Sequence, residues 1–156
     1  MEYGLVALWL ATYLLVLYVG MPIARAVLPD LDDFGAGVAL PLALAVVWLV
    51  VFVVGRLSVQ VGLWAGLVVL GALSAVAWLR GYDVDHDAYV RVALVFATAF
   101  CFLIAIRAVD PAAHPGGGEK FLDMSLLQSS LRGSTIPPED PWFAGETVRY
   151  YYGGHM

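Results

Sequence analysis

Four long apolar runs, separated by short polar segments, restrict this chain to one class of fold. A transmembrane helix needs about 20 mostly apolar residues to cross about 30 Å of hydrocarbon. Inside the bilayer, each segment must satisfy its own backbone N–H and C=O groups, which favours helices. We therefore predict an all-α membrane protein with four transmembrane helices, at residues 3–24, 34–54, 59–79 and 88–109.

The composition excludes several classes of function. Hydrophobic residues make up 62% of the chain and charged residues 13%, whereas about 25% of the residues of a soluble domain are charged. The 13 acidic residues outnumber the 8 basic ones, so nucleic acid is not an expected partner, because such binding requires a basic face. The acidic excess and the single lysine, Lys120, suit a halophilic archaeal source. A transporter or channel has little support, because transport paths usually place ionisable residues within the spans.

The third span contains pairs of small residues four positions apart. Gly62 pairs with Gly66, and Gly71 pairs with Ala75. This spacing lets helix backbones approach closely, although Gly and Ala are also simply frequent in membrane helices. In the second span, Pro41 predicts a kink, because proline removes a backbone hydrogen bond.

The arginines at the span ends predict an orientation. Arg25, Arg80 and Arg91 lie at the ends that face one side, and Arg56 and Arg107 lie at the ends that face the other. Because cytoplasmic loops carry the excess of basic residues, we expect a multi-pass protein of the cell membrane with both termini external.

The loop before the fourth span, "RGYDVDHDAYVR", carries an acidic cluster. Asp83, Asp85 and Asp87 alternate around His86, which suggests a metal site. A calcium-binding loop requires a turn glycine where this sequence has Ala88. We therefore interpret the segment as a solvated acidic loop.

A polar tail follows the fourth span, over residues 110–156. Its segment 119–132 has the pattern of a short amphipathic helix, with Leu122, Leu126 and Leu131 forming an apolar stripe. Such a helix is too short to cross a bilayer, so we expect it to lie in the membrane interface.

Two carboxylates on this helix are candidates for chemistry. Glu119 and Asp123 are four residues apart and therefore share a helix face. Together they could hold a divalent cation, or one could act as a general base. The alternative is an ordinary solvated helix face.

The last part of the tail is rich in aromatic residues. Trp142 suits an interfacial anchor, and Arg149 is available for a phosphate. Tyr150, Tyr151 and Tyr152 offer flat faces that could stack on a sugar or lie among lipid headgroups. The alternative is an aromatic belt at the start of another membrane helix.

The order of residues along the whole tail is also informative. The segment "GEKFLDMSLLQSSLRGSTIPPEDPW", followed by "RYYYGGH", resembles an archaeal and bacterial membrane protein family named for its YYY signature. That family is itself similar to the GT-C glycosyltransferases, which take a sugar from a polyprenyl-phosphate carrier. The resemblance is strongest over residues 107–155.

The resemblance implies a function and a set of site residues. A GT-C-like protein would transfer a sugar from its lipid carrier to an external acceptor, with Asp123 as the general base. Glu119 would be the partner of that base or a ligand of a divalent cation. Arg149, Trp142 and the three tyrosines would contribute to the substrate groove.

The resemblance also implies that this chain is the N-terminal part of a longer protein. Members of the family continue through many more transmembrane helices after the YYY motif, whereas this sequence ends at Met156. A C-terminal transmembrane portion is then an expected partner, and the isolated chain is expected to be inactive. The alternative function is a non-catalytic membrane interaction or assembly module.

Overall fold

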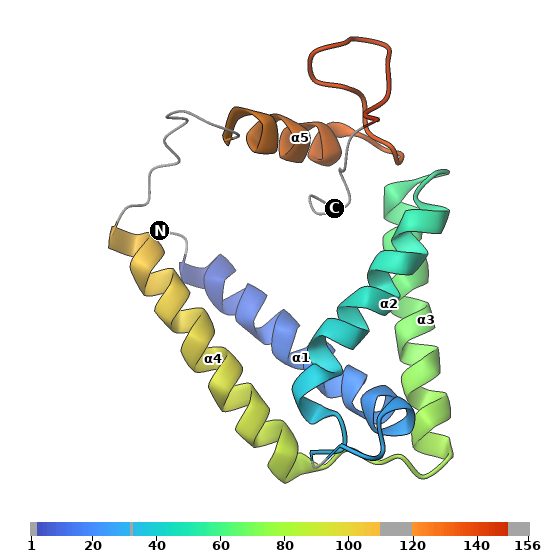
Figure 1. Cartoon of the computed structure of the whole chain (residues 1–156), viewed down its shortest axis with the longest axis vertical. Helices are drawn as coiled ribbons and strands as arrows, with labels where there is room; N and C mark the ends of the chain where they lie inside the picture. Colours follow the sequence, from blue (N-terminus) through green and yellow to red (C-terminus); the bar gives the residue numbers. More distant parts are fainter. Residues whose placement is uncertain (1–2, 32, 110–119, 150–156) are drawn as a thin grey trace. The chain divides into compact units, whose positions relative to one another are not determined.

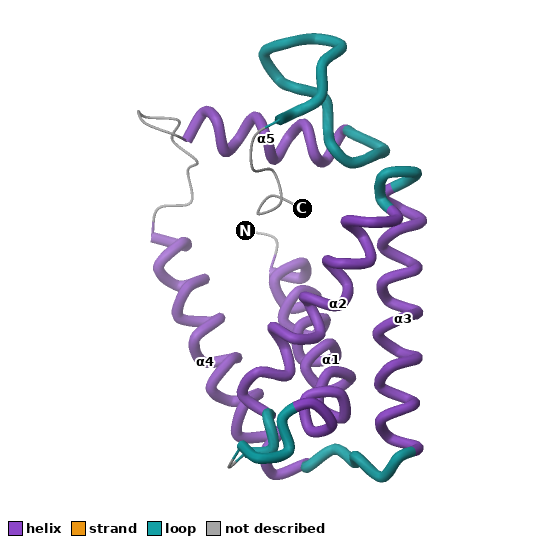
Figure 2. Tube along the Cα trace, turned by 45° about the vertical axis from the view of Figure 1, so that its right-hand side comes forward, coloured by secondary structure: helices purple, strands orange, loops and turns teal. Residues whose placement is uncertain are grey.

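A computed structural model describes residues 3–31, 33–109 and 120–149 of the chain. Within these ranges the regular elements are all helices (Figures 1 and 2), which confirms the predicted fold class. The elements, in chain order, are α1 (Tyr3–Val27), the short 3-10 helix η1 (Ala36–Val38), α2 (Ala39–Val54), α3 (Val59–Leu79), α4 (His86–Val109) and α5 (Lys120–Arg132).

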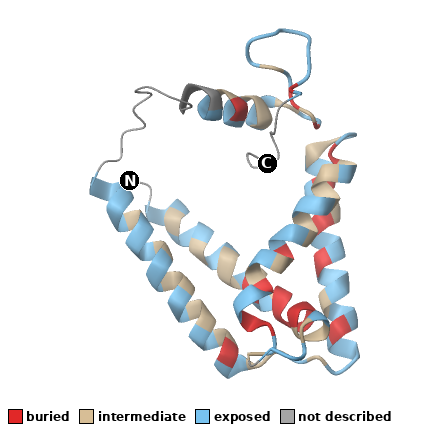
Figure 3. Ribbon diagram, in the orientation of Figure 1, coloured by how far each residue is buried: buried red, intermediate tan, exposed pale blue. Residues whose placement is uncertain are grey.

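Four of these helical segments are long and apolar enough to cross a membrane, namely α1, η1 with α2, α3 and α4. Many of their large apolar side chains are exposed, and Figure 3 shows that exposed positions occur along all four helices. Exposure of this kind suits helices whose surroundings are lipid tails rather than water.

The start of α4 is defined by a capping residue. The Ala88 N–H donates a hydrogen bond of 2.9 Å to Asp85 Oδ1, and the Tyr89 N–H donates one of 2.8 Å to the Asp85 carbonyl. This is the N-cap arrangement, in which a side chain satisfies an N–H that has no partner within the helix. The cap explains why α4 begins at His86 rather than at residue 88.

The described residues divide into two compact units, 3–46 with 69–109 and 47–68 with 120–149. In the first unit, α1 meets the start of α2 in backbone contact at Gly20. A Cβ atom at this position would lie 2.5 Å from the Ala39 carbonyl oxygen. Buried residues concentrate around this crossing (Figure 3). They are Leu17, Met21, Ala24, Ala36, Ala39 and Ala88.

The second unit contains the end of α2, the start of α3, α5 and the loop that follows α5. A Cβ atom at Gly66 would lie 3.1 Å from the Val47 carbonyl oxygen, and one at Gly62 would lie 3.0 Å from the Gly55 nitrogen. The close approach predicted for Gly62 and Gly66 is therefore confirmed.

The other small-residue pair behaves differently. A Cβ atom at Gly71 would meet nothing within 4 Å, so the prediction of tight packing at Gly71 and Ala75 is wrong. Both residues line a cavity of the first unit instead.

The kink predicted at Pro41 is not required by the structure. Pro41 lies in the first turn of α2, where an N–H group has no partner within an α-helix, so the missing donor costs nothing. The interior proline is Pro22, in α1.

The polar tail is attached to the turn between α2 and α3. The Ile136 N–H donates a hydrogen bond of 2.9 Å to the Gly55 carbonyl, and the Val59 N–H donates one of 2.7 Å to the Ser134 carbonyl. The Ile136 side chain is 6% exposed. With four crossing spans, this turn and the tail lie on the same side of the membrane, so the connectivity permits the contact.

The apolar stripe predicted for α5 is only partly present. Leu126 is 2% exposed, whereas Leu131 is 77% exposed. The side chain of Leu122 lies outside the described residues. An exposed Leu131 is compatible with a helix in the membrane interface, so the interfacial position of α5 stays a prediction.

Candidate functional site

The loop after α5 folds back on itself in the manner of a hairpin. The Val148 N–H donates a hydrogen bond of 3.0 Å to the Pro138 carbonyl, and the Asp140 N–H donates one of 2.8 Å to the Glu146 carbonyl. Gly145 has a φ of 84°, a left-handed conformation that glycine adopts at little cost. The loop 138–148 is therefore a defined element rather than a loose connection.

Two carboxylates fix the tip of this loop. Asp140 Oδ1 accepts hydrogen bonds from the N–H groups of Trp142 at 2.8 Å and Phe143 at 3.2 Å. Glu139 Oε1 accepts one from the Gly145 N–H at 2.9 Å. The side chains of Trp142 and Phe143 are consequently presented outward, 56% and 69% exposed. An Asp two residues before an N–H donor is a known turn former, and this signal was present in "EDPW".

A polar cleft of 520 Å³ lies between α5 and the loop. The Ser129 hydroxyl joins its two walls by donating a hydrogen bond to the Glu139 carbonyl. The α5 residues of the cleft recur at helical spacing and therefore share one face. The lining includes Ser125, Gln128, Ser129 and Arg132 of α5, with Glu139 and Trp142 of the loop.

These side chains can bind hydroxyl groups, and Arg132 can bind one phosphate beside the carboxylates of Glu139 and Asp140. The Arg132 guanidinium can form paired hydrogen bonds with a phosphate. Trp142 offers a flat apolar ring face, and Gln128 can donate and accept hydrogen bonds. Sequence reasoning missed Arg132 and Gln128 as site residues. The available signal was the four-residue spacing of these polar side chains along α5.

The family described as "Uncharacterized membrane protein (DUF2298)" matches residues 42–156, well over half of the chain. The chain belongs to the DUF2298 family. The matched region runs from the first turns of α2 to the polar tail, so the cleft lies entirely within it. No curated protein matches the chain, and no solved structure matches it.

In this DUF2298 chain, Asp123 lies away from the cleft. It occupies the first turn of α5 and is exposed. At about 100° per residue, Asp123 is about 200° around the helix from Ser125, which places it on the opposite face. Glu119 lies outside the described residues, so the predicted pair is not described as a pair.

Of the remaining predicted site residues, the structure describes Trp142, which lines the cleft, and Arg149, which does not. Arg149 forms an exposed ion pair with Glu146, with 3.5 Å between Nη2 and Oε2. These two residues and Phe143 line a second hollow, of 360 Å³, on the loop. Residues Tyr150, Tyr151 and Tyr152 lie outside the described ranges. Among the described residues, no three potential metal ligands converge.

Proposed function

We propose that this DUF2298 chain takes part in transferring a sugar from a polyprenyl-phosphate carrier to an acceptor on the external side of the membrane. The observation that carries the proposal is the cleft lined by Arg132 and Trp142. It belongs to a tail that is hydrogen-bonded to the turn between α2 and α3. A lipid-linked sugar would place its phosphate and sugar at this level while its polyprenyl chain remained in the bilayer.

Two side chains of the cleft recognise the two parts of such a donor, its phosphate and its sugar. Arg132 binds the phosphate through charge-assisted hydrogen bonds. The Trp142 ring packs on the apolar face of the sugar. Arg149 and the three tyrosines extend the groove toward the acceptor, the role that the family resemblance implies for them.

Two carboxylates compete for the role of general base. Asp123, with Glu119 as its partner or as a second ligand of a divalent cation, is the choice that the resemblance implies. Glu139 lines the cleft, and only its Oε1 atom accepts the Gly145 N–H. A base must come within hydrogen-bond reach of the acceptor hydroxyl, so variants of each carboxylate separate the two assignments.

The proposal includes an orientation and a partner. Both termini face outward, in agreement with the distribution of arginines at the span ends. A C-terminal transmembrane portion supplies the remaining walls of the site, because one polar cleft of 520 Å³ is too small to enclose a lipid carrier and an acceptor together.

The proposal is tested in the organism that carries the gene, by replacing the chromosomal copy with single variants. The variants are Asp123→Asn, Glu139→Gln and Arg132→Ala, with Asp30→Asn as a matched exposed carboxylate that does not line the cleft. Mass spectrometry measures the sugars on external proteins and lipids, and immunoblotting measures the amount of each variant. We expect replacement of the carboxylate that acts as the base to abolish one sugar product, and Arg132→Ala to reduce it about 10-fold or more, equivalent to about 1.4 kcal/mol.

The outcomes separate the assignments. Loss of the product in Glu139→Gln but not in Asp123→Asn would transfer the role of base to Glu139. A deletion of the gene that leaves every external sugar unchanged would remove the proposed transfer altogether.

A second function, a non-catalytic assembly module, is favoured by the exposed loop tip. Trp142 and Phe143 stand side by side at 56% and 69% exposure on a loop fixed by internal hydrogen bonds. Such a tip suits the binding of a membrane partner. This function predicts that Phe143→Ala abolishes co-purification of a partner while all external sugars remain unchanged.

A further inference from the structure

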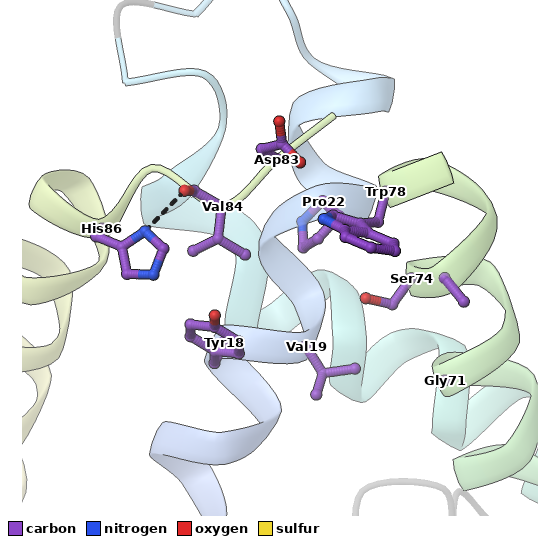
Figure 4. A pocket seen from close by; sticks show the side chains of 10 residues that line it. Tyr18, Val19, Pro22, Gly71, Ser74, Trp78, Asp83, Val84 and His86 are labelled. Atoms are coloured by element: carbon purple, nitrogen blue, oxygen red, sulfur yellow. Dashed lines mark hydrogen bonds between the residues drawn. The ribbon is translucent and has the colours of Figure 1, made fainter. Parts of the chain in front are cut away.

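A second cavity, of 610 Å³, lies in the first unit between α1 and α3 (Figure 4). It is unrelated to the cleft on the tail. The residues that line the cavity and those that line the cleft do not overlap. An inference about this cavity therefore stands or fails independently of the proposed sugar transfer.

One part of the cavity is apolar and follows the helices. Val19 and Pro22 of α1 face Gly71 and Ala75 of α3 across it. A Cβ atom at Gly71 would meet nothing within 4 Å, so the small residues of α3 widen the space rather than bringing a helix closer. Such a slot suits a hydrocarbon chain.

The other part of the cavity is polar and aromatic. Tyr18 of α1, Ser74 and Trp78 of α3, Asp83 and His86 line this part, and Figure 4 shows Ser74 and Trp78 on one side of α1 and Tyr18 with His86 on the other. The rings of Tyr18 and His86 meet edge to face, with their centroids 6.1 Å apart. The cavity therefore joins an apolar slot to a polar end, the form of an amphiphile.

The polar end is rich in hydrogen-bond acceptors. His86 Nδ1 lies 3.1 Å from the Val84 carbonyl oxygen. A carbonyl oxygen only accepts, so this contact is a hydrogen bond when Nδ1 carries a proton; in the neutral tautomer of that kind, Nε2 is an acceptor. The Asp83 carboxylate also only accepts, and Ser74 can do either. A ligand with many donors matches this set.

The charges disfavour a phosphate at this position. Asp83 lines the cavity, and Asp85 and Asp87 follow it closely in the chain. Arg25 does not line the cavity; its Nη1 atom donates a hydrogen bond of 3.0 Å to the Asp83 carbonyl, and its guanidinium lies 4.9 Å from the centre of the Phe34 ring. A phosphate, which is anionic and mainly accepts hydrogen bonds, would meet like charge and acceptors.

We propose that this cavity binds a membrane amphiphile whose headgroup is uncharged and rich in hydroxyl groups. The hydroxyls donate hydrogen bonds to Asp83 and to His86 Nε2, and the flat ring of Trp78 packs on the apolar face of the headgroup. The hydrocarbon chain lies in the slot beside Gly71 and Ala75.

The test uses the whole chain in nanodiscs of zwitterionic lipid, with the indole nitrogen atoms of its tryptophans labelled for NMR. Three amphiphiles with the same alkyl chain are added separately below micelle-forming concentrations: octyl glucoside, octyl phosphocholine and octyl trimethylammonium. We expect octyl glucoside alone to produce a saturable shift of the Trp78 indole signal, which Trp78→Phe identifies. The signal of Trp64, which is 63% exposed on α3 and does not line the cavity, should not shift.

Two variants of the polar end make the test specific. Asp83→Asn and Ser74→Ala should each weaken the binding of octyl glucoside, with Asp83→Asn weakening it about 10-fold, because a hydrogen bond to a charged group contributes about 1.5–3 kcal/mol. Asp87→Asn makes the same change of charge on an exposed residue that does not line the cavity, and it should bind normally.

Three results would each overturn the proposal. The first is an equal shift with all three amphiphiles, which indicates partitioning without selection. The second is a preference for the phosphocholine or the ammonium compound. The third is unchanged binding in both Asp83→Asn and Ser74→Ala.

Discussion

Two glycines in the spans have different surroundings in the structure, although nothing in the sequence distinguishes them. Gly20 is in backbone contact with Ala39, whereas Gly71 faces open space in the cavity between α1 and α3. Protein interiors are close-packed, so an added methyl group is tolerated only where space exists. The same substitution should therefore have different effects at the two positions.

We expect Gly20→Ala to destabilise the first unit by about 1–3 kcal/mol, the usual cost of overpacking. The added Cβ atom would lie 2.5 Å from the Ala39 carbonyl oxygen, which belongs to the backbone and cannot rotate away. Gly71→Ala is the matched control and should leave stability nearly unchanged. Thermal unfolding in detergent, followed by circular dichroism, measures both variants, and an equal loss in the two would contradict the packing described here.

The stabilisation of α4 by its capping residue, Asp85, depends on pH. The Ala88 N–H lowers the pKa of the Asp85 carboxyl below 3.8, assisted by the Asp87 N–H and by the charges of Arg91 and Arg25 and opposed by desolvation. A native pKa below the unfolded one means that the stabilisation is fully present above pH 3.8 and is lost as the pH falls through the lowered native value.

We therefore expect the first turn of α4 to lose this stabilisation as the pH falls below 3.8 and through the lowered native pKa of Asp85. Asp85→Asn should remove this contribution while keeping a cap, because the amide oxygen also accepts the Ala88 N–H. Asp87→Asn, which leaves the cap intact, should titrate as the wild type does. Hydrogen exchange at the Ala88 amide measures the effect, and identical pH profiles for wild type and Asp85→Asn would disprove it.

At the scale of elements, the polar tail is held by few contacts. Leu126 of α5, Ile136 and Val148 are its buried large apolar residues among those described. The two hydrogen bonds to the turn between α2 and α3 align Ile136 with Gly55. Anchoring by so few groups makes the tail sensitive to a single substitution.

Ile136→Ala should release the tail from this turn. Truncation of a buried isoleucine costs about 2–5 kcal/mol, and the loss falls on the contact with Gly55. The Val59 amide, which donates to the Ser134 carbonyl, should then exchange its hydrogen at least 10-fold faster, equivalent to about 1.4 kcal/mol.

Leu127→Ala is the control for this experiment, because Leu127 is 39% exposed and does not line the hollow that Val59 and Ile136 share. Equal acceleration of exchange in both variants would show that Ile136 is not the anchor.

At the scale of the whole molecule, the four spans separate two kinds of chemistry. The cleft with Arg132 lies in the unit that contains the turn between α2 and α3, and the acceptor-rich cavity lies in the unit that contains the loop before α4. Each therefore meets a different side of the membrane if all four helices cross it.

Cysteine labelling tests this arrangement. Cys101, the single cysteine, is replaced by alanine, and Leu57→Cys, Ala144→Cys and Asp87→Cys are introduced one at a time at exposed positions. An impermeant reagent added to intact cells should label Leu57→Cys and Ala144→Cys to the same extent. It should label Asp87→Cys only after the membrane is opened. The reverse pattern would refute the external orientation, and labelling of Leu57→Cys and Ala144→Cys from opposite sides would refute the four crossings.

The candidate site was only partly accessible to sequence reasoning. Trp142 was identified from its residue type, and it lines the cleft. Arg132 was interpreted only as a residue at the helix end, because its place in the cleft depends on the folding back of the loop. Asp123 was chosen from the resemblance, and its position on the other face of α5 appears only when the cleft is known.

The sequence by itself determined the four apolar helices, the short helix of the tail and the membership of a membrane protein family. These features depend on the length of each apolar run, on the capping residues and on the order of residues, all of which can be read from the sequence. Only the tertiary structure decided that Gly62 packs against a helix while Gly71 lines a cavity, and that Ile136 attaches the tail to the turn between α2 and α3. The physical reason is that small residues and backbone N–H groups are alike in the sequence and differ only in what the fold brings within a few ångströms of them.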